Sequence, residues 1–177
     1  MSQRTELDRF RLVWDKDAQA TLRLLETLPA NQYDFRPDPD GRSLGELAWH
    51  LSEIEAYTSL CVAQRRFAFD VKPPNIERPR EVKLLAPGYR RIHDEALERL
   101  SKLDDKALEE IVTYFDGRGM SIRDILWEGV IHHLIHHRGQ LVLMCRLAGG
   151  TPPGLFGPTR EEMAAMRAAR AQEKSRA

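Results

Sequence analysis

The sequence predicts an all-α protein, a four-helix bundle followed by a short C-terminal helix. Four long stretches carry apolar residues at steps of three and four, the period of a helix that buries one face. Proline and glycine concentrate between these stretches, where they end helices and form loops. The chain of 177 residues suits a single domain over residues 1–177, and it shows no convincing sheet pattern.

Composition narrows the class of function. Lys plus Arg and Asp plus Glu each number 27, so the formal net charge is zero. This balance argues against a nucleic-acid partner and against electrostatic attraction to a membrane surface. No apolar run approaches the roughly 20 residues of a membrane helix, and the N-terminal residues lack the apolar region of a signal peptide. We therefore expect a cytoplasmic protein in which Cys61 and Cys145 are reduced core residues.

The first helix is expected over residues 5–28, where Pro29 follows it, and the second over residues 43–67. Ser43-x-x-Glu46 opens the second helix as a capping box, in which each side chain accepts a hydrogen bond from the other residue's backbone N–H. His50 lies at the edge of the inner apolar face of this helix, about 40° from Ile54 on a helical wheel.

The third helix is predicted over residues 82–103, and its start is open. Pro87-Gly88 lies inside this span. The helix either begins near Pro87, because proline suits a first turn, or contains an earlier turn that is kinked there. In the connection that follows, Ile111 to Phe115 form a short strand-like piece before a turn at Asp116-Gly117.

The fourth helix is predicted over residues 121–148, from the cap Ser121-x-x-Asp124 to the Gly149-Gly150 stop. A last helix over residues 159–172 is rich in alanine, glutamate and arginine, and residues 173–177 are expected to be disordered. The loops before the second and third helices each run to roughly a dozen residues, so a crossover topology is open.

Four of the six histidines fall at positions 132, 133, 136 and 137 of the fourth helix. They form two pairs with the same i, i+4 spacing. On a wheel of 100° per residue, His133 and His137 point to the core, and His132 and His136 lie on the flank. Two imidazoles one turn apart on one face can bind one metal ion. Hydrogen-bonded core histidines are the alternative, because a buried imidazole also needs a polar partner.

His50 is the expected third ligand. Three neutral histidines leave positions open for water or substrate, which is typical of a catalytic rather than a structural metal site. Imidazole suits several divalent transition metals, so we expect zinc or nickel first, with iron, cobalt and manganese also compatible.

Other residues are weaker candidates for the site. Glu53 is either an acceptor or proton-transfer group beside His50 or a solvated glutamate. Gln140 projects with the ligand face and either orients a histidine or bound water, or packs near the core. Tyr57 either lines the pocket or packs in the core. Arg138 is expected to make a structural salt bridge, and the remaining histidine, His93, to lie at the surface.

Two segments resemble the DinB/YfiT-like superfamily of metal-binding four-helix bundles. They are Leu47-Ala48-Trp49-His50-Leu51 and His133 to Leu141, the second of which matches the pattern H-x-x-x-H-R-G-Q. The tail Leu155-Phe156-Gly157-Pro158 resembles the family's closing loop. The resemblance implies an up-down-down-up bundle, homodimers, and His50, His133 and His137 as the metal ligands. It suggests no contact with DNA.

The resemblance implies three activities: thiol S-transfer, mycothiol-dependent isomerisation and metal-dependent hydrolysis. We expect a metal-dependent enzyme that activates a low-molecular-weight thiol for transfer to a small electrophile. A hydrolase using metal-activated water and a non-catalytic metal- or ligand-binding stress protein are the alternatives. The sequence lacks the H-E-x-x-H motif of a zinc peptidase and the paired Glu-x-x-His motifs of a di-iron bundle.

Apolar residues also fall on the predicted outer faces of two helices. They are Ile131, Ile135 and Val142 in the fourth helix and Trp49, Ala56 and Leu60 in the second. Apolar stripes on outer faces predict a covering surface, which is a second copy of the chain in a homodimer or the chain's own last helix.

Overall fold

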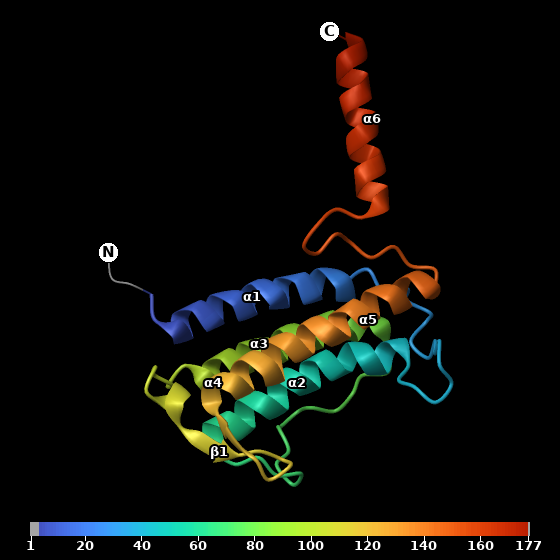
Figure 1. The fold of residues 1–177 in the computed structure, drawn as a ribbon. Coiled ribbons are helices and arrows are strands. Elements are labelled where there is room, and N and C mark those ends of the chain that lie inside the picture. The colour runs from blue at the N-terminus through green and yellow to red at the C-terminus, as the bar shows by residue number, and fades with distance from the viewer. Residues whose placement is uncertain (1–3, 177) are drawn as a thin grey trace.

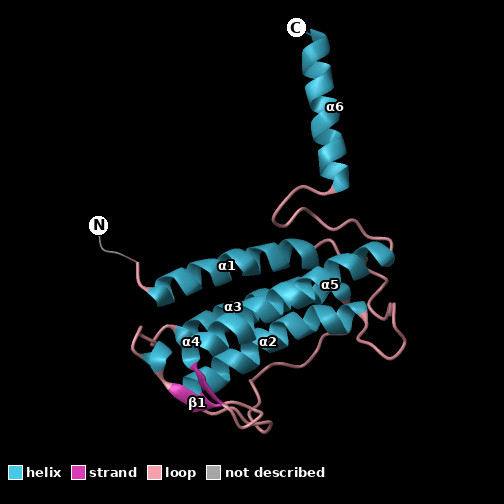
Figure 2. Cartoon of the chain, in the orientation of Figure 1, coloured by secondary structure: helices cyan, strands magenta, loops and turns pink. Residues whose placement is uncertain are grey.

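Four long helices lie side by side in the structure, a computed structural model that describes residues 4–176 (Figure 1). The first and fourth run in one direction and the second and third in the other, which is the predicted up-down-down-up order. The all-α prediction is confirmed, and the two short strands lie at one end of the bundle (Figure 2). The helices are α1 (Glu6–Leu25), α2 (Leu44–Gln64), α3 (Leu85–Leu100) and a composite fourth helix made of α4 (Ile122–Asp124), η3 (Ile125–His132) and α5 (His133–Leu147).

The predicted helix starts coincide with side-chain caps. Thr5 and Asp8 form a capping box at α1, and Ser43 and Glu46 form the predicted one at α2. Both helices end before the predicted residues 28 and 67. In α2 the reason is Arg65, which takes a left-handed backbone conformation with φ of 55° and stops the helix.

The third helix starts as a tight turn, η1 (Val82–Leu84), that leads directly into α3. Pro87 falls in the first turn of α3, where a missing N–H costs nothing, so the first of the two predicted alternatives is close to the structure. Gly88 is needed for packing, because a Cβ there would lie 2.7 Å from the ring of Trp49.

A short helical turn and a two-stranded hairpin join the third and fourth helices. The turn η2 (Ala107–Glu109) precedes β1 (Ile111–Thr113), which pairs antiparallel with β2 (Gly119–Ser121). The predicted strand-like piece is therefore present over Ile111–Thr113. The second strand of the hairpin ends at Ser121, which is also the N-cap of α4.

The predicted outer stripes are partly wrong. Trp49, Ala56 and Ile131 are buried inside the chain. Trp49 and Ala56 lie on α2, which packs against α3, α5 and η3. The Trp49 indole donates to the carbonyl of Ile76 in the 65–81 loop at 3.1 Å. Ile135 remains exposed, at 47 %, and Leu60 and Val142 are half-buried.

The last helix, α6 (Arg160–Arg176), projects away from the bundle (Figure 1). It is held at its start by the ion pair of Arg146 with Glu161 at 2.9 Å, and it does not cover the outer face of α5. The helix continues past residue 172, so the predicted disorder of residues 173–176 is wrong; Ala177 lies outside the described residues. Within residues 4–176, no helix has both the length and the apolar character needed to span a membrane.

A layer of polar side chains crosses the core. The fully buried carboxylate of Glu55 accepts hydrogen bonds from the Tyr89 hydroxyl and, at 2.8 Å, from Nδ1 of His93. The prediction that His93 lies at the surface is therefore wrong: it is 3 % exposed, because a buried carboxylate requires polar partners. Arg138 makes the predicted salt bridge, with Asp17 at 2.9 Å, and this pair is also buried.

Candidate metal centre

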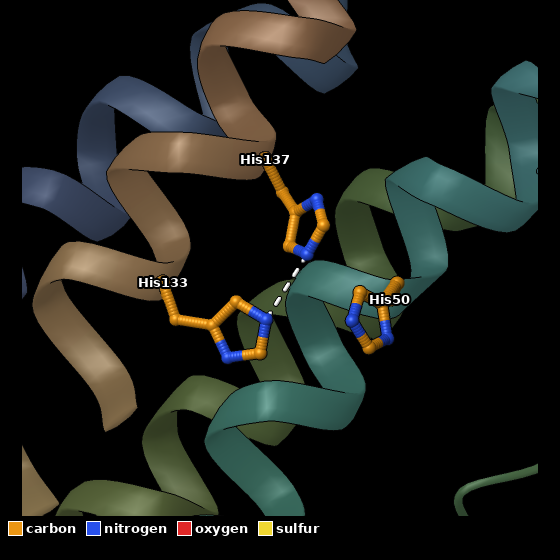
Figure 3. Close-up of side chains that lie close together, drawn as sticks. All are labelled: His50, His133 and His137. Carbon is orange, nitrogen blue, oxygen red and sulfur yellow. Dashed lines mark hydrogen bonds between the residues drawn. The ribbon is translucent and has the colours of Figure 1, made fainter. Parts of the chain in front are cut away.

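His50 from α2 meets His133 and His137 from α5 in the space between the two helices (Figure 3). The ring centroids lie 4.8–5.6 Å apart, and one nitrogen of each ring lies within 4.8 Å of the others. Among the described residues this is the group that could hold a metal ion. The structure thus brings together the three predicted ligands and leaves His132 and His136 outside the cluster.

A π-helical segment, η3, sets the position of the histidine pair. The backbone N–H of His133 bonds to the carbonyls of Glu128 and Val130, so the helix is wider here than an α-helix. A single wheel of 100° per residue therefore fails across this segment. The pair does not point at the centre of the core, as the wheel predicted, but lies partly exposed at the edge of the buried face. That face of α5 consists of Leu134, Arg138, Leu141, Met144 and Cys145.

Each imidazole ring also donates a hydrogen bond, through the nitrogen that faces away from the other two rings, to a neighbouring acceptor. Nδ1 of His50 lies 3.0 Å from Oε2 of Glu53, and Nδ1 of His137 lies 2.7 Å from Oε1 of Gln140. The ring of His133 donates to the backbone carbonyl of Gly129, a group that the π-helix releases from the backbone N–H of His133. Such outer partners fix the tautomer and orientation of metal-binding histidines.

These hydrogen bonds leave unprotonated Nε2 atoms on the inner side. Nε2 of His133 and Nε2 of His137 face each other at 3.0 Å, as the dashed line in Figure 3 shows. When both rings donate through their other nitrogen, two lone pairs face each other and repel. A cation between them removes the repulsion, so this donor set fits a divalent transition metal.

The electrostatics keep the ligands in the metal-binding form. Burial, with smaller contributions from His137 and His50, lowers the pKa of His133 to about 4. Burial also lowers the pKa of His137, although its hydrogen bond to Gln140 acts in the opposite direction. Both imidazoles are therefore neutral near pH 7, as metal binding requires.

Two of the weaker candidates contact the ligands directly. Burial acts to raise the pKa of Glu53, but the hydrogen bond from His50 and the nearby Arg78 and Arg42 outweigh it, so the pKa is lowered and the carboxylate is ionised. Gln140 contacts His137 through its oxygen, and its nitrogen lies 3.2 Å from Nε2 of His136.

The third weak candidate, Tyr57, stays unassigned. It is half-buried against the core, burial raises its pKa, and its hydroxyl makes no hydrogen bond within residues 4–176.

Sequence reasoning missed two contributors to this site. His136 supports Gln140 from the flank, and its signal was the i, i+4 spacing of those two residues. Arg78, from the 65–81 loop, approaches Glu53 to 3.7 Å and Glu46 to 3.2 Å. Glu53 and Glu46 precede Arg78 by 25 and 32 positions, and no local pattern connects residues so far apart, so only the fold reveals these contacts.

Fold and site together define a four-helix bundle protein with a candidate tri-histidine metal centre between its second and fourth helices. The sequence model of the DinB family matches residues 1–174, and the chain belongs to this family.

Individual relatives agree with this assignment. The chain is 28 % identical over 159 residues to the uncharacterized protein YrdA of Bacillus subtilis (strain 168), which covers 89 % of this chain and 92 % of that protein. The fold of the present chain is similar to that of a DinB-like protein from Bacillus cereus ATCC 10987. The TM-score is 0.67, and the identity is 31 % over 82 % of this chain and 94 % of that one. The DinB-like protein YjoA from Bacillus subtilis is similar in fold, with a TM-score of 0.67 and 20 % identity over 86 % of this chain and 99 % of that one.

Proposed function

We propose that this DinB-family protein is a metal-dependent enzyme that activates a low-molecular-weight thiol for transfer to a small electrophile. One observation carries the proposal: three imidazoles converge from two helices at a partly exposed position. Three protein ligands leave the remaining coordination positions open to a small molecule. Zinc and nickel are the first candidates for the metal, with iron, cobalt and manganese also compatible, and we place the enzyme in the cytoplasm.

A divalent ion in this position would lower the pKa of a thiol or water bound to it. The chain's residues supply the geometry. His50, His133 and His137 provide the ligand nitrogens, while Glu53 and Gln140 hold two of the rings in orientation. In the proposed reaction the thiol sulfur forms a bond to an electrophilic carbon. The leaving group departs with its bonding electron pair, and the thiol proton passes to solvent.

The same open position supports a second candidate function, hydrolysis by activated water. The two reactions differ in their dependence on thiol, because only the transferase incorporates sulfur into its product. A metal- or ligand-binding stress protein would bind without turnover of either kind.

The test uses the full chain loaded with zinc or nickel, a bacillithiol-type thiol and an aryl chloride electrophile. We expect a thioether adduct that requires the metal and disappears in His137→Ala. The matched control is His132→Ala, which removes an exposed histidine outside the cluster and should leave the rate unchanged. Thiol consumption that His137→Ala leaves intact contradicts the transferase. Ester or amide cleavage without thiol supports the hydrolase instead.

A further inference from the structure

Two glutamates flank His50 on one stripe of α2. Glu46 precedes His50 by four residues and Glu53 follows it by three, so the three side chains lie within about 60° of one another around the helix. Glu53 contacts the ligand directly, since its Oε2 atom lies 3.0 Å from Nδ1 of His50. This contact leaves Oε1 of Glu53 to another partner. A group that binds Oε1 fixes the carboxylate and, through it, the ring of His50.

Arg78, from the 65–81 loop, is the partner of this second oxygen. Its guanidinium spans the two glutamates on either side of His50. Nη1 lies 3.2 Å from Oε1 of Glu46, and Nη2 lies 3.7 Å from Oε1 of Glu53. The third donor, Nε, is buried and has no acceptor among residues 4–176. The two carboxylates therefore hold this end of the side chain.

The backbone around Arg78 is fixed independently of these ion pairs. The hydroxyl of Tyr33 donates to the carbonyl of Pro79 at 2.6 Å, and the indole of Trp49 donates to the carbonyl of Ile76 at 3.1 Å. Both carbonyls lie within two residues of Arg78, and the side chain of Ile76 is buried. The loop therefore presents the guanidinium to α2 from a fixed backbone, which reduces the entropy lost when the ion pairs form.

The two glutamates do not depend equally on Arg78. Oε2 of Glu46 lies 2.8 Å from Arg36 and accepts a hydrogen bond from the backbone N–H of Ser43 at 2.8 Å. Glu53 has no such second cation, because Arg78 is the one lysine or arginine of the described chain within 4.0 Å of it. Removal of the Arg78 charge therefore affects mainly Glu53, the carboxylate that contacts the ligand.

We propose that Arg78 is a positioning residue of the metal centre, which holds Oε1 of Glu53 and so fixes the carboxylate that orients His50. The site is then completed from a loop outside the helices that carry its ligands. The inference requires a metal ion at the three histidines, as the proposed function does, and it is independent of thiol transfer. The effect is reciprocal, because a metal ion that binds the oriented His50 stabilises the contact of Arg78 with Glu53 by the same factor.

The experiment measures zinc affinity without substrate, by competition with a chromophoric chelator. Arg78→Gln should weaken zinc binding about five-fold, the upper limit for a partly exposed charge pair. Arg78→Lys should retain part of the affinity, because it keeps the charge and loses the fork that reaches both glutamates. Glu53→Gln keeps an acceptor for His50 but removes the charge that Arg78 contacts. Arg78→Gln should therefore cause no further loss when it is added to Glu53→Gln.

The matched control is Arg123→Gln. Arg123 also bridges two carboxylates, Glu6 and Glu109, and its side chain is 35 % exposed, against 33 % for Arg78. Arg123→Gln and Arg78→Gln should lower the free energy of unfolding of the metal-free protein to a similar extent, whereas only Arg78→Gln should weaken zinc binding.

Three results overturn the inference and leave the proposed function standing. They are an unchanged zinc affinity in Arg78→Gln, equal losses of affinity in Arg78→Gln and Arg123→Gln, and a further five-fold loss when Arg78→Gln is added to Glu53→Gln. A wild-type protein that binds neither zinc nor nickel overturns the proposed function, and the inference with it.

Discussion

Gln140→Ala should weaken metal binding without removing a ligand. The amide oxygen of Gln140 lies 2.7 Å from Nδ1 of His137, and His136 holds the amide nitrogen at 3.2 Å. In the variant, Nδ1 of His137 loses its acceptor, and the ring is free to rotate or to adopt the other tautomer. Both changes take the lone pair of Nε2 away from the position it shares with His133.

The expected loss of metal affinity follows from the exposed position of the hydrogen bond between Gln140 and His137. Replacing an outer partner of a ligand histidine typically lowers metal affinity about 10- to 100-fold. Gln140 is exposed, so water replaces part of the lost hydrogen bond, whose net value is about 1 kcal/mol. We therefore expect the lower end of that range, about ten-fold. His136→Ala should reduce metal affinity by a smaller factor, because His136 acts on the ligand only through Gln140.

Competition with a chromophoric zinc chelator measures this affinity directly. Gln140→Glu keeps an acceptor at the same place and should retain binding, whereas His132→Ala tests for a general effect of surface histidines. The reasoning fails if Gln140→Ala matches the wild type while His137→Ala abolishes binding. It also fails if His132→Ala causes the same loss as Gln140→Ala.

Three further predictions follow from the structure. The metal-free protein should lose stability as pH falls from about 6.5 towards 4, because His133 resists protonation when folded and accepts a proton when unfolded; urea titrations of His133→Ala should show a flatter dependence. Arg138→Met should cost about 3–5 kcal/mol in the same assay by leaving Asp17 buried without its partner, and unchanged stability would contradict this. Leu143 is an exposed apolar residue of α5, and Leu143→Glu should convert a dimer to a monomer in sedimentation at micromolar concentration; a monomeric wild type would refute the homodimer.

The homodimer prediction now depends on a stripe of α5 that shares only Ile135 with the one that the wheel suggested. Ile135, Leu143 and Leu147 are exposed along α5, and Gly139 between them has open space where a Cβ would stand. Nothing within the described chain explains a glycine there, although glycine weakens an exposed helix by about 1 kcal/mol. Close approach of the same helix from a second copy would explain both features.

Local chemistry made much of the fold predictable. The capping box at Ser43 and the helix turn containing Pro87 depend on neighbouring residues, so their signals lie in short segments. His93 and Glu55 show the limit of prediction from local sequence. Each has an ordinary place in its own helix, and their burial follows only from the hydrogen bond that joins α3 to α2 across 38 positions of sequence.

The metal centre shows the same limit within one helix. Spacing alone could not separate the pair His133 and His137 from the pair His132 and His136, because both have the i, i+4 spacing; the wheel favoured His133 and His137, whose shared face meets His50 in the structure. The direction of that face could not be predicted, since η3 rotates α5 relative to the turns that precede it. The rotation has two consequences for the site. It moves the pair from the core to the edge of the bundle, where a small molecule can reach it, and it releases the Gly129 carbonyl to orient His133. The π-helical segment, across which the helical wheel fails, therefore supplies two features that an accessible tri-histidine centre requires: exposure of the ligands and a fixed acceptor for His133.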